Sequence, residues 1–477
     1  MALLLGAFAR LLSFPRVFAG NKLSFVGGPD AYCHLRRAEL VLAGKLADVD
    51  QWANYPFGAD VSLLPHAYSH ILAFAMSHFG NIGLLTFPLL CGLLSIVVLK
   101  SLSDKFPSAS FIMILYSVMP IVVILSSWGA IDHHCVEALC LVLALRGRRW
   151  YGVALLGSWL TTTTWPVIAM VIVVTEAIRS RIPWLQMLAL VIGPLGLLIA
   201  GRSFFMDPWQ NEIKEMKSLL AGSEGLTRSL TLMSVSLICI PWALHVWWKS
   251  RALDHVASLL SAALVTFPLA LLHARFAIFL AVPGVFAMGE VLQSLRERFH
   301  RVISVAFIAA SFTWIAIGLA SIPNSAVDPP LAIRRALDVM RQVTPTPGDY
   351  LAPQQQPDYG VAAAWDLGHA ITALAMRPAV ASPYLSGNRG RDLMRNIFFS
   401  EPRIASEIAD KHAARYLLLT KLRVAAGPAR SLYERLYYDH DTQLGWDCIY
   451  QSPEIFRLDG VEVPAVQIWE RNTGTVY

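Results

Sequence analysis

Long apolar segments alternate with short polar connections along this chain, and that pattern limits it to one class of fold. A helix needs roughly 17–25 mostly apolar residues to cross a bilayer, and about eleven segments approach that length. Only 15% of the residues are charged, against about 25% in an average soluble domain. Because lipid offers no hydrogen-bond partners, each spanning segment must be an α-helix. The candidate segments are 1–20, 81–100, 108–126, 135–147, 149–163, 164–178, 183–201, 229–248, 253–272, 276–291 and 302–321.

Basic residues fall in every second connection, and this predicts how the helices are oriented. Because such residues are enriched in cytoplasmic connections, the alternate connections are predicted on the outer face. The net charge of +6 is explained by these clusters and gives no indication of nucleic-acid binding. The chain is predicted to be a multi-pass protein of the inner or plasma membrane. Its outward connections are 21–80, 127–134, 161–164, 202–228, 273–275 and everything after 322.

The composition changes after residue 322 to a mixed pattern with prolines and charges, which predicts a second domain. Residues 1–322 are predicted to form a transmembrane catalytic domain with outer loops 21–80, 127–134 and 202–228. Residues 323–477 are predicted to form an α/β domain on the periplasmic or extracellular face. The apolar stretch 66–79, which carries three histidines, is expected to be an interfacial helix. Within the second domain we predict helices at 331–343, 405–411 and 430–437 and buried strands at 414–419 and 465–469.

Asp132 and His134 lie between two apolar segments, where a polar side chain beside hydrocarbon is costly. In an extended backbone alternate side chains share a face, so this spacing lets an acid and an imidazole point into one site. That arrangement suits a divalent cation. A hydrated loop with surface histidines explains the same short motif, so the choice between the two depends on the rest of the chain.

Three further outward connections carry unusual polar residues. Asp30 follows a Gly-Pro turn before a predicted helix, where an acid also serves as a helix cap. Glu215 lies in the loop 211–216, which also fits a solvated amphipathic helix. Arg275 lies at the outer end of a helix, where a snorkelling side chain is common. Together with 132–134 they place acids, a histidine and an arginine on one side of the membrane.

These residue types point to lipid-phosphate chemistry. Asp and His ligands suit Mg²⁺ or Mn²⁺, and Zn²⁺ less well in the absence of thiolates. An arginine at headgroup level can hold a phosphate through two hydrogen bonds. The pattern predicts a membrane enzyme that handles a lipid phosphate on its outer face.

The outward segments resemble the motifs of the catalytic subunit of oligosaccharyltransferase, most of all its single-subunit bacterial and archaeal members. This family moves a glycan from a polyprenyl-pyrophosphate carrier to protein asparagine. The resemblance implies a polytopic α-helical membrane protein of the GT-C type, with about 11–13 transmembrane helices and a C-terminal α/β domain on the outer face. The resembling segments are DAYCHLRR at 30–37, DQWANYPFG at 50–58, GAIDHHCVE at 129–137, EIKE at 212–215, HARF at 273–276 and WDLGH at 365–369, followed by Arg377 and Pro378.

The resemblance also implies roles for residues around the donor. Asp30, Asp132 and His134 are expected to hold Mg²⁺ or Mn²⁺, and Arg275 to contact the phosphates of the polyprenyl-linked sugar. The metal and the arginine would stabilise the departing pyrophosphate. His133 is expected to point away from the site, and Glu137 to lie in the first turn of the next helix, where it favours the helix dipole.

For the acceptor, the resemblance implies that Asp30 and Glu215 orient an asparagine amide for inverting attack on the sugar. Trp365 and Asp366, together with Glu215, are expected to bind the acceptor peptide. Ala364 and Leu367 replace a Trp and a Tyr of the family's W-W-D-Y-G signature, and Cys33 replaces an aromatic residue after Asp30. The loss of the Trp and the Tyr should weaken recognition of a hydroxyl two residues after the asparagine.

Two alternatives compete with this function. A GT-C glycosyltransferase could use a polyprenyl-monophosphate sugar and a hydroxyl or lipid acceptor. Such enzymes often work without a metal, so Asp132 and His134 together with Glu215 favour the first function. A transporter or flippase would place its acids near the bilayer centre, whereas Asp30, Asp132 and Glu215 fall in predicted outer connections.

Overall fold

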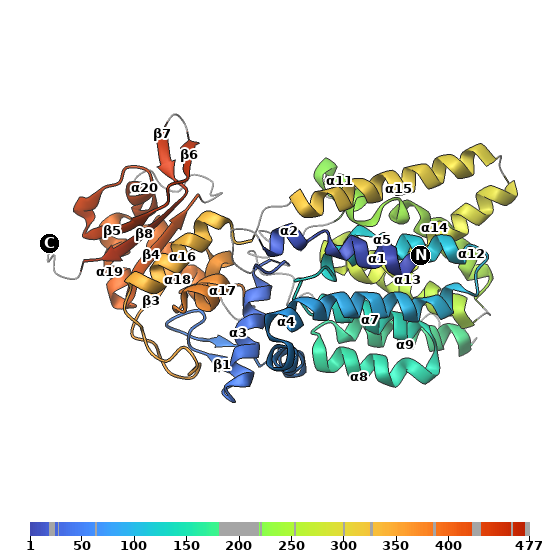
Figure 1. Ribbon diagram of the computed structural model, residues 1–477, viewed down its shortest axis with the longest axis horizontal. Coiled ribbons are helices and arrows are strands. Elements are labelled where there is room, and N and C mark those ends of the chain that lie inside the picture. Colours follow the sequence, from blue (N-terminus) through green and yellow to red (C-terminus); the bar gives the residue numbers. More distant parts are fainter. Residues whose placement is uncertain are drawn as a thin grey trace. The chain divides into compact units, whose positions relative to one another are not determined.

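The described part of the chain forms two compact units, and each is described by itself (Figure 1). The helical unit comprises Met1–Val17, Pro65–Tyr68 and Asn81–Ser325, and the α/β unit comprises Phe18–Leu64, Ser69–Gly80 and Ala326–Tyr477. The computed structural model describes residues 1–18, 24–26, 28–62, 64–180, 219, 222–251, 254–298, 301–324, 328–384, 388–421, 431–458 and 461–472.

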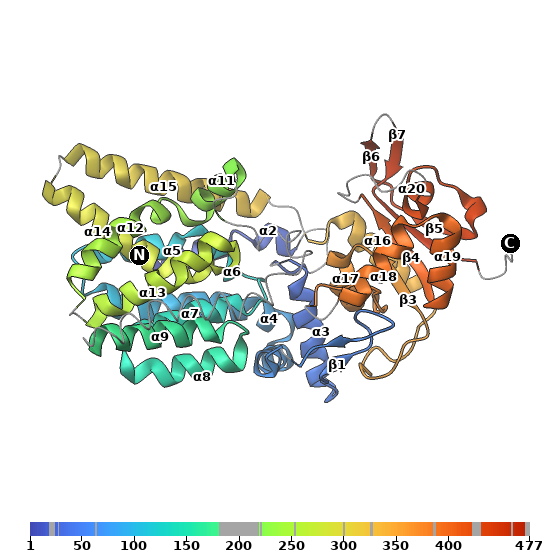
Figure 2. The ribbon, with the colours of Figure 1, turned by 180° about the vertical axis from the view of Figure 1, so that it is seen from behind.

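The helical unit consists of α-helices joined by short turns. Its helices are α1 (Ala2–Leu11), α2 (Phe14–Val17), α4 (His66–Ser103), α5 (Ala109–Val118), α6 (Pro120–Leu125), α7 (His134–Leu145), α8 (Tyr151–Thr161), α9 (Trp165–Ser180), α11 (Gly222–Met233), α12 (Ser236–Lys249), α13 (Asp254–Leu272), α14 (Ala277–Arg298) and α15 (Arg301–Asn324). Helices α7, α8 and α9 lie side by side, and α13 packs against α9 and α14 (Figure 2).

Several of these helices have the length and composition of membrane spans. Among the described residues, four helices qualify: His66–Ser103, Asp254–Leu272, Ala274–Arg296 and Arg301–Pro323. Helices α11 and α12 would make a fifth span if the pair, which is bent by 72°, crosses as one. The chain is therefore a multi-pass membrane protein, as predicted.

Some predicted membrane segments differ from the helices of the structure, and one lies outside the described residues. Segment 108–126 is divided into α5 and α6 at Met119, whose ψ of 120° is not helical. The residue before a proline is driven out of the helical region, and Pro120 follows it. Helix α4 includes both 66–79 and 81–100, with a break at Gly80 (φ 60°, ψ −152°). Segment 183–201 lies outside the described residues.

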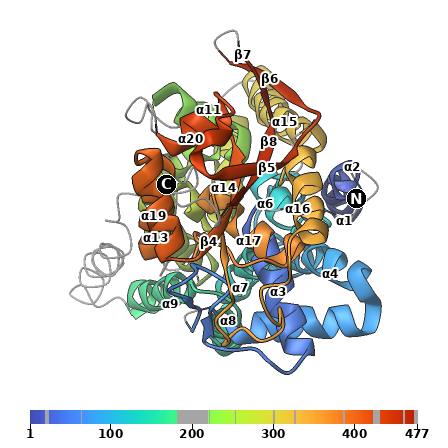
Figure 3. The ribbon, with the colours of Figure 1, turned by 90° about the vertical axis from the view of Figure 1, so that its left-hand side faces the viewer.

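The α/β unit contains a four-stranded sheet, flanking helices and two hairpins. The strand order of the sheet is β3-β4-β8-β5, in which β3 and β4 are parallel and the other two pairs are antiparallel. The hairpin β6–β7 extends from this sheet (Figure 3). The elements are α3 (Asp30–Leu42), β1 (Val49–Asp50), β2 (Ala59–Asp60), α16 (Leu331–Val343), β3 (Gly360–Ala363), α17 (Gly368–Ala370), α18 (Asn388–Phe399), α19 (Pro402–Lys411), β4 (Ala414–Thr420), α20 (Leu432–Tyr437), β5 (Trp446–Gln451), β6 (Ile455–Leu458), β7 (Val461–Pro464) and β8 (Val466–Arg471).

The sheet is covered on both faces. Leu417 and Leu419 of β4 join an apolar cluster with residues of α18, α19 and α20. The alternate residues Tyr416 and Leu418 point to the opposite face and are also buried. The predicted strands 414–419 and 465–469 are confirmed as β4 and β8, and the predicted helix 331–343 is confirmed as α16.

The compact units divide the chain differently from the predicted domains, because residues 18–64 and 69–80 group with the C-terminal part. Buried Arg36 of α3 explains much of this grouping. Its guanidinium donates to both carboxylate oxygens of Asp50, at 2.9 and 3.0 Å, and to the carbonyl oxygen of Tyr350 at 3.0 Å. The ring of Tyr350 lies 4.4 Å from the guanidinium carbon. Burial opposes the charge of Arg36, but the carboxylate of Asp50 outweighs it and raises the pKa of Arg36 above its usual value.

Removing one partner of the Arg36–Asp50 pair should destabilise the α/β unit strongly. Arg36→Ala leaves a buried carboxylate without its cation, and such a change costs about 3–5 kcal/mol. Thermal unfolding followed by intrinsic fluorescence measures the loss. Arg403→Ala is the matched control, because Arg403 pairs with Glu407 on the surface and should change stability by less than about 1 kcal/mol. Equal effects of the two substitutions would contradict this account.

Candidate active site

Asp132 and His134 lie in the turn that leads into α7. Gly129 has a φ of 90°, which glycine accepts without strain, and the amide of Asp132 donates to the carbonyl of Ala130 at 2.7 Å. His133 is the N-cap residue of α7, and His134 is its first residue. The backbone at 132–134 is therefore not extended, and Asp132 and His134 approach each other across the start of the helix instead.

Four buried side chains meet at this turn. His134 Nε2 lies 3.6 Å from Asp132 Oδ2, and His134 Nδ1 lies 2.6 Å from Glu137 Oε2. His133 Nδ1 lies 2.9 Å from Asp132 Oδ1, and its ring centroid lies 4.6 Å from that of His134. His133, which was expected to point away, is thus part of the cluster.

Arg275 adds a positive charge near this cluster. It lies in the 3₁₀ turn Ala274–Phe276 between α13 and α14, and its side chain is half-buried. Its positive charge acts on the imidazole of His134 and on the carboxylate of Glu137. The helical unit therefore brings together three residues that were predicted around the donor, namely Asp132, His134 and Arg275.

The donor atoms of this turn fit a divalent cation. Protein nitrogen and oxygen ligands lie about 2.0–2.2 Å from a metal such as zinc, so Asp132 Oδ2 and His134 Nε2, 3.6 Å apart, can share one ion. His133, His134 and Glu137 each offer a ligand atom within 4.8 Å of the others. Mixed imidazole and carboxylate donors suit Mn²⁺ and Zn²⁺ better than Mg²⁺, which prefers oxygen.

The remaining predicted residues lie in the α/β unit or outside the described residues. Asp30 is the exposed first residue of α3 and follows the N-cap residue Pro29, so Asp30 is not itself the N-cap. Trp365 and Asp366 form a 3₁₀ turn after β3; Trp365 is half-buried against the core of the unit, and Asp366 is exposed. Glu215 lies outside the described residues.

His369, in the same segment as Trp365 and Asp366, is a core residue. It is 5% exposed, and its ring packs edge-on against Tyr384 at 4.5 Å between centroids. Burial lowers the pKa of His369 to about 3, and the nearby imidazole of His34 adds to this effect. The folded α/β unit therefore holds His369 in its neutral form.

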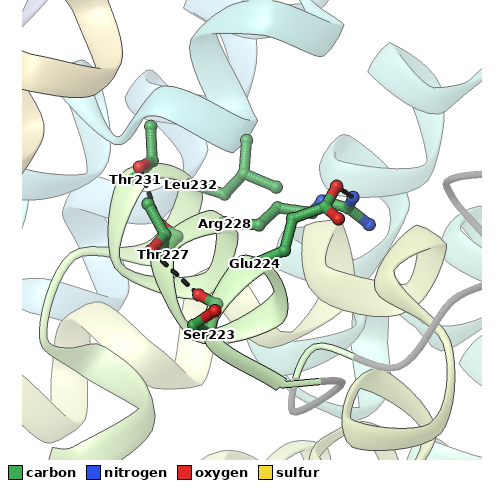
Figure 4. A pocket seen from close by; sticks show the side chains of 6 residues that line it. All are labelled: Ser223, Glu224, Thr227, Arg228, Thr231 and Leu232. Atoms are coloured by element: carbon green, nitrogen blue, oxygen red, sulfur yellow. Dashed lines mark hydrogen bonds and ion pairs between the residues drawn. The ribbon is translucent and has the colours of Figure 1, made fainter.

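A shallow hollow of about 500 Å³ runs along α11 (Figure 4). It contains none of the predicted site residues. Its two charged side chains, Glu224 and Arg228, pair with each other at 3.0 Å. Because each charge already has a partner, we assign no ligand to this hollow. The lining residues are Ser223, Glu224, Thr227, Arg228, Thr231 and Leu232.

Two residues of the cluster were not predicted to have a role in the site. Glu137 follows His134 by three positions, and residues three apart share a face of a helix, so the H-x-x-E spacing was a usable signal. Thr164 donates to Glu137 Oε1 but is 27 residues away in the sequence. Nothing local marks it among four consecutive threonines.

Comparisons with known proteins agree with this fold. No model of a known protein family matches the sequence. The chain is 32% identical over 156 residues to dolichyl-phosphooligosaccharide-protein glycotransferase 2 of Archaeoglobus fulgidus. That match covers 30% of this chain and 26% of the relative, so the aligned segment spans about a quarter of that relative's length.

Two solved structures share the fold across nearly the whole chain. The archaeal oligosaccharyltransferase AglB from Archaeoglobus fulgidus, in complex with an inhibitory peptide and a dolichol-phosphate, is 14% identical with a TM-score of 0.74, covering 98% of this chain and 88% of that chain. An Archaeoglobus fulgidus oligosaccharyltransferase in complex with Zn and sulfate is 15% identical with a TM-score of 0.71, covering 99% and 88%.

The fold is that of the GT-C membrane glycosyltransferases, as predicted. The sequence match over 156 residues and the shared fold are similarities to archaeal oligosaccharyltransferases, and they agree with the predicted resemblance.

The α/β unit should lose stability as the pH falls below about 6.5, partly because of His369. The folded state keeps this imidazole neutral down to about pH 3, whereas the unfolded chain takes up the proton near pH 6.5. Between these values the unfolded state binds more protons, so the free energy of unfolding falls by up to about 1.4 kcal/mol per pH unit. Above about pH 6.5 this contribution is fully present.

Thermal unfolding of the unaltered chain and of His369→Gln, followed from about pH 8 to about pH 4, measures this contribution. The variant should lose less stability on acidification than the unaltered chain. Identical pH dependence of the two proteins would show that His369 does not titrate as described.

Proposed function

We propose that the chain is a metal-dependent oligosaccharyltransferase that moves a glycan from a polyprenyl-(pyro)phosphate carrier to an acceptor, which we take to be protein asparagine. The observation that carries this proposal is the pair of buried side chains Asp132 and His134, with the half-buried Arg275 near them, in a chain with the GT-C fold. The Archaeoglobus fulgidus structures with a dolichol-phosphate, a peptide, and Zn with sulfate support a lipid-phosphate donor, a peptide acceptor and a divalent cation.

In this proposal Asp132 and His134 hold the cation, and Asp30 is the third predicted ligand. When bound, Mn²⁺ or Mg²⁺ would supply positive charge that stabilises a pyrophosphate leaving group. Arg275 supplies a second positive charge, in a form that pairs with phosphate oxygens through two hydrogen bonds. A preorganised pair of cations beside a departing phosphate is a large contribution to rate in such transfers.

The acceptor side of the proposal rests on the predicted residues of the α/β unit and on Glu215. Asp30 and Glu215 would accept hydrogen bonds from the asparagine amide and orient its nitrogen. Trp365 and Asp366 would bind the acceptor peptide. The proposed location of these groups is the periplasmic or extracellular face, because the basic connections are predicted to face the cytoplasm.

A transfer from a polyprenyl-monophosphate sugar to a hydroxyl or lipid acceptor is the second candidate. The observation that favours it is the altered signature, in which Ala364 and Leu367 replace a Trp and a Tyr. The buried imidazoles and carboxylates at α7 favour the metal-dependent reaction.

Asp132→Ala and His134→Ala should each lower glycan transfer by about 100-fold or more, a larger loss than the 10–100-fold expected for an outer-shell partner. Transfer from extracted lipid-linked glycan to peptide, measured in membranes with added Mn²⁺, gives the rate. His78→Ala is the control, because His78 is an exposed histidine of α4. Full activity in the presence of a strong chelator would contradict the metal role.

A further inference from the structure

We propose that Glu137 is a positioning residue that fixes the orientation and tautomer of His134, and that Thr164 in turn fixes Glu137. The inference rests on the proposed function, because it concerns the cation that Asp132 and His134 would hold. It assigns a role to two residues that lie outside the predicted ligand set.

Thr164, Glu137 and His134 are connected by hydrogen bonds, and the donor and the acceptor of each bond follow from the chemistry of these side chains. Glu137 Oε2 lies 2.6 Å from His134 Nδ1, and Glu137 Oε1 accepts a hydrogen bond from the hydroxyl of Thr164. An ionised carboxylate can only accept, so Nδ1 of His134 carries the hydrogen. In the neutral imidazole the other nitrogen, Nε2, then has its lone pair available. Nε2 is the atom that lies 3.6 Å from Asp132 Oδ2.

Glu137 acts on His134 rather than on His133. The distance from His133 Nε2 to Glu137 Oε1 is 3.7 Å, longer than a hydrogen bond, and that oxygen already accepts from Thr164. His133 contacts Asp132 instead, through Nδ1 at 2.9 Å. Because each carboxylate oxygen already makes a hydrogen bond within the cluster, we assign Glu137 to the support of His134.

The burial of Glu137 indicates that it does more than interact favourably with the dipole of α7. A carboxylate in the first turn of α7 stabilises the helix when solvated, but the side chain of Glu137 is 1% exposed. A buried charge is costly unless it is paired and hydrogen-bonded. The contacts with His134 of α7 and with Thr164 of the connection between α8 and α9 provide that compensation.

Thr164 is itself held in place by the connection between α8 and α9. The carbonyl oxygen of Thr164 accepts a hydrogen bond from the amide of Val167, in the first turn of α9, at 2.9 Å, and Trp165 begins α9 directly after Thr164. The connection 161–164 is predicted on the same side of the membrane as 127–134. The threonine-rich turn thus places the hydroxyl of Thr164 beside Glu137, in the first turn of α7.

A carboxylate that orients a metal-binding imidazole typically changes metal affinity by 10–100-fold. Glu137→Ala should therefore weaken Mn²⁺ binding about 10–100-fold. Glu137→Gln keeps an oxygen that can accept from Nδ1 and should lose less. Thr164→Val, which removes the hydroxyl at constant shape, should weaken binding more than Thr164→Ser.

The experiment titrates the purified full chain in detergent with Mn²⁺ and follows free Mn²⁺ by electron paramagnetic resonance. Glu176→Gln is the matched control: Glu176 lies on α9 and pairs with Arg148 and Arg179, and its replacement should leave Mn²⁺ affinity unchanged. Gel filtration and thermal unfolding check that each variant is folded, and Glu137→Gln and Thr164→Val keep the test valid if Glu137→Ala does not fold.

The outcomes separate this inference from the proposed function. If the unaltered chain binds Mn²⁺, Asp132→Ala abolishes binding, and the Glu137 and Thr164 variants bind within twofold of the unaltered chain, the positioning role is wrong and the metal site stands. If the unaltered chain binds no Mn²⁺, the metal of the proposed function and the positioning role both fail. The expected result is a graded loss of Mn²⁺ affinity, in which Glu137→Ala binds more weakly than Glu137→Gln and Thr164→Val binds more weakly than Thr164→Ser.

Discussion

Charged side chains buried among apolar helices must be paired, and the arrangement at the start of α7 depends on this requirement. A carboxylate without partners in such surroundings costs several kcal/mol. Glu137 is compensated by His134 and Thr164, and Asp132 by two imidazoles at 2.9 and 3.6 Å. The contacts that make burial tolerable also hold the side chains in the arrangement on which the proposed metal site depends.

The α/β unit meets the same requirement in different ways. Arg36 pairs with Asp50 through two hydrogen bonds and links α3 to the C-terminal part of the unit. His369 is held neutral instead. Arg377, which resembles a residue near the family's signature, donates to the main-chain carbonyls of Thr344, Arg341 and Met376 at 2.7, 3.0 and 2.8 Å. Arg36, His369 and Arg377 therefore have structural roles, although each lies in or beside a segment that resembles a motif of the family.

The sequence predicted what depends on local pattern. Apolar periodicity located α16, β4 and β8, and the motifs pointed to the archaeal oligosaccharyltransferases to which the chain is similar. It missed features set by tertiary contacts. The role of Glu137 requires Thr164 from a distant turn, and the division of the units depends on Arg36 reaching Tyr350 across 314 positions. The break at Met119 was a local signal that the prediction overlooked, because Pro120 follows it. The combined role predicted for Asp30 and Glu215 stays a prediction.

The most direct test of the central claim is mass spectrometry of glycopeptides and glycolipids from cells with and without this chain. The account predicts that cells with the chain contain peptides with a glycan on asparagine. Cells without the chain should lack these glycopeptides and accumulate the lipid-linked donor. Unchanged protein glycans, together with a sugar that appears on a lipid or hydroxyl acceptor when the chain is present, would contradict the account.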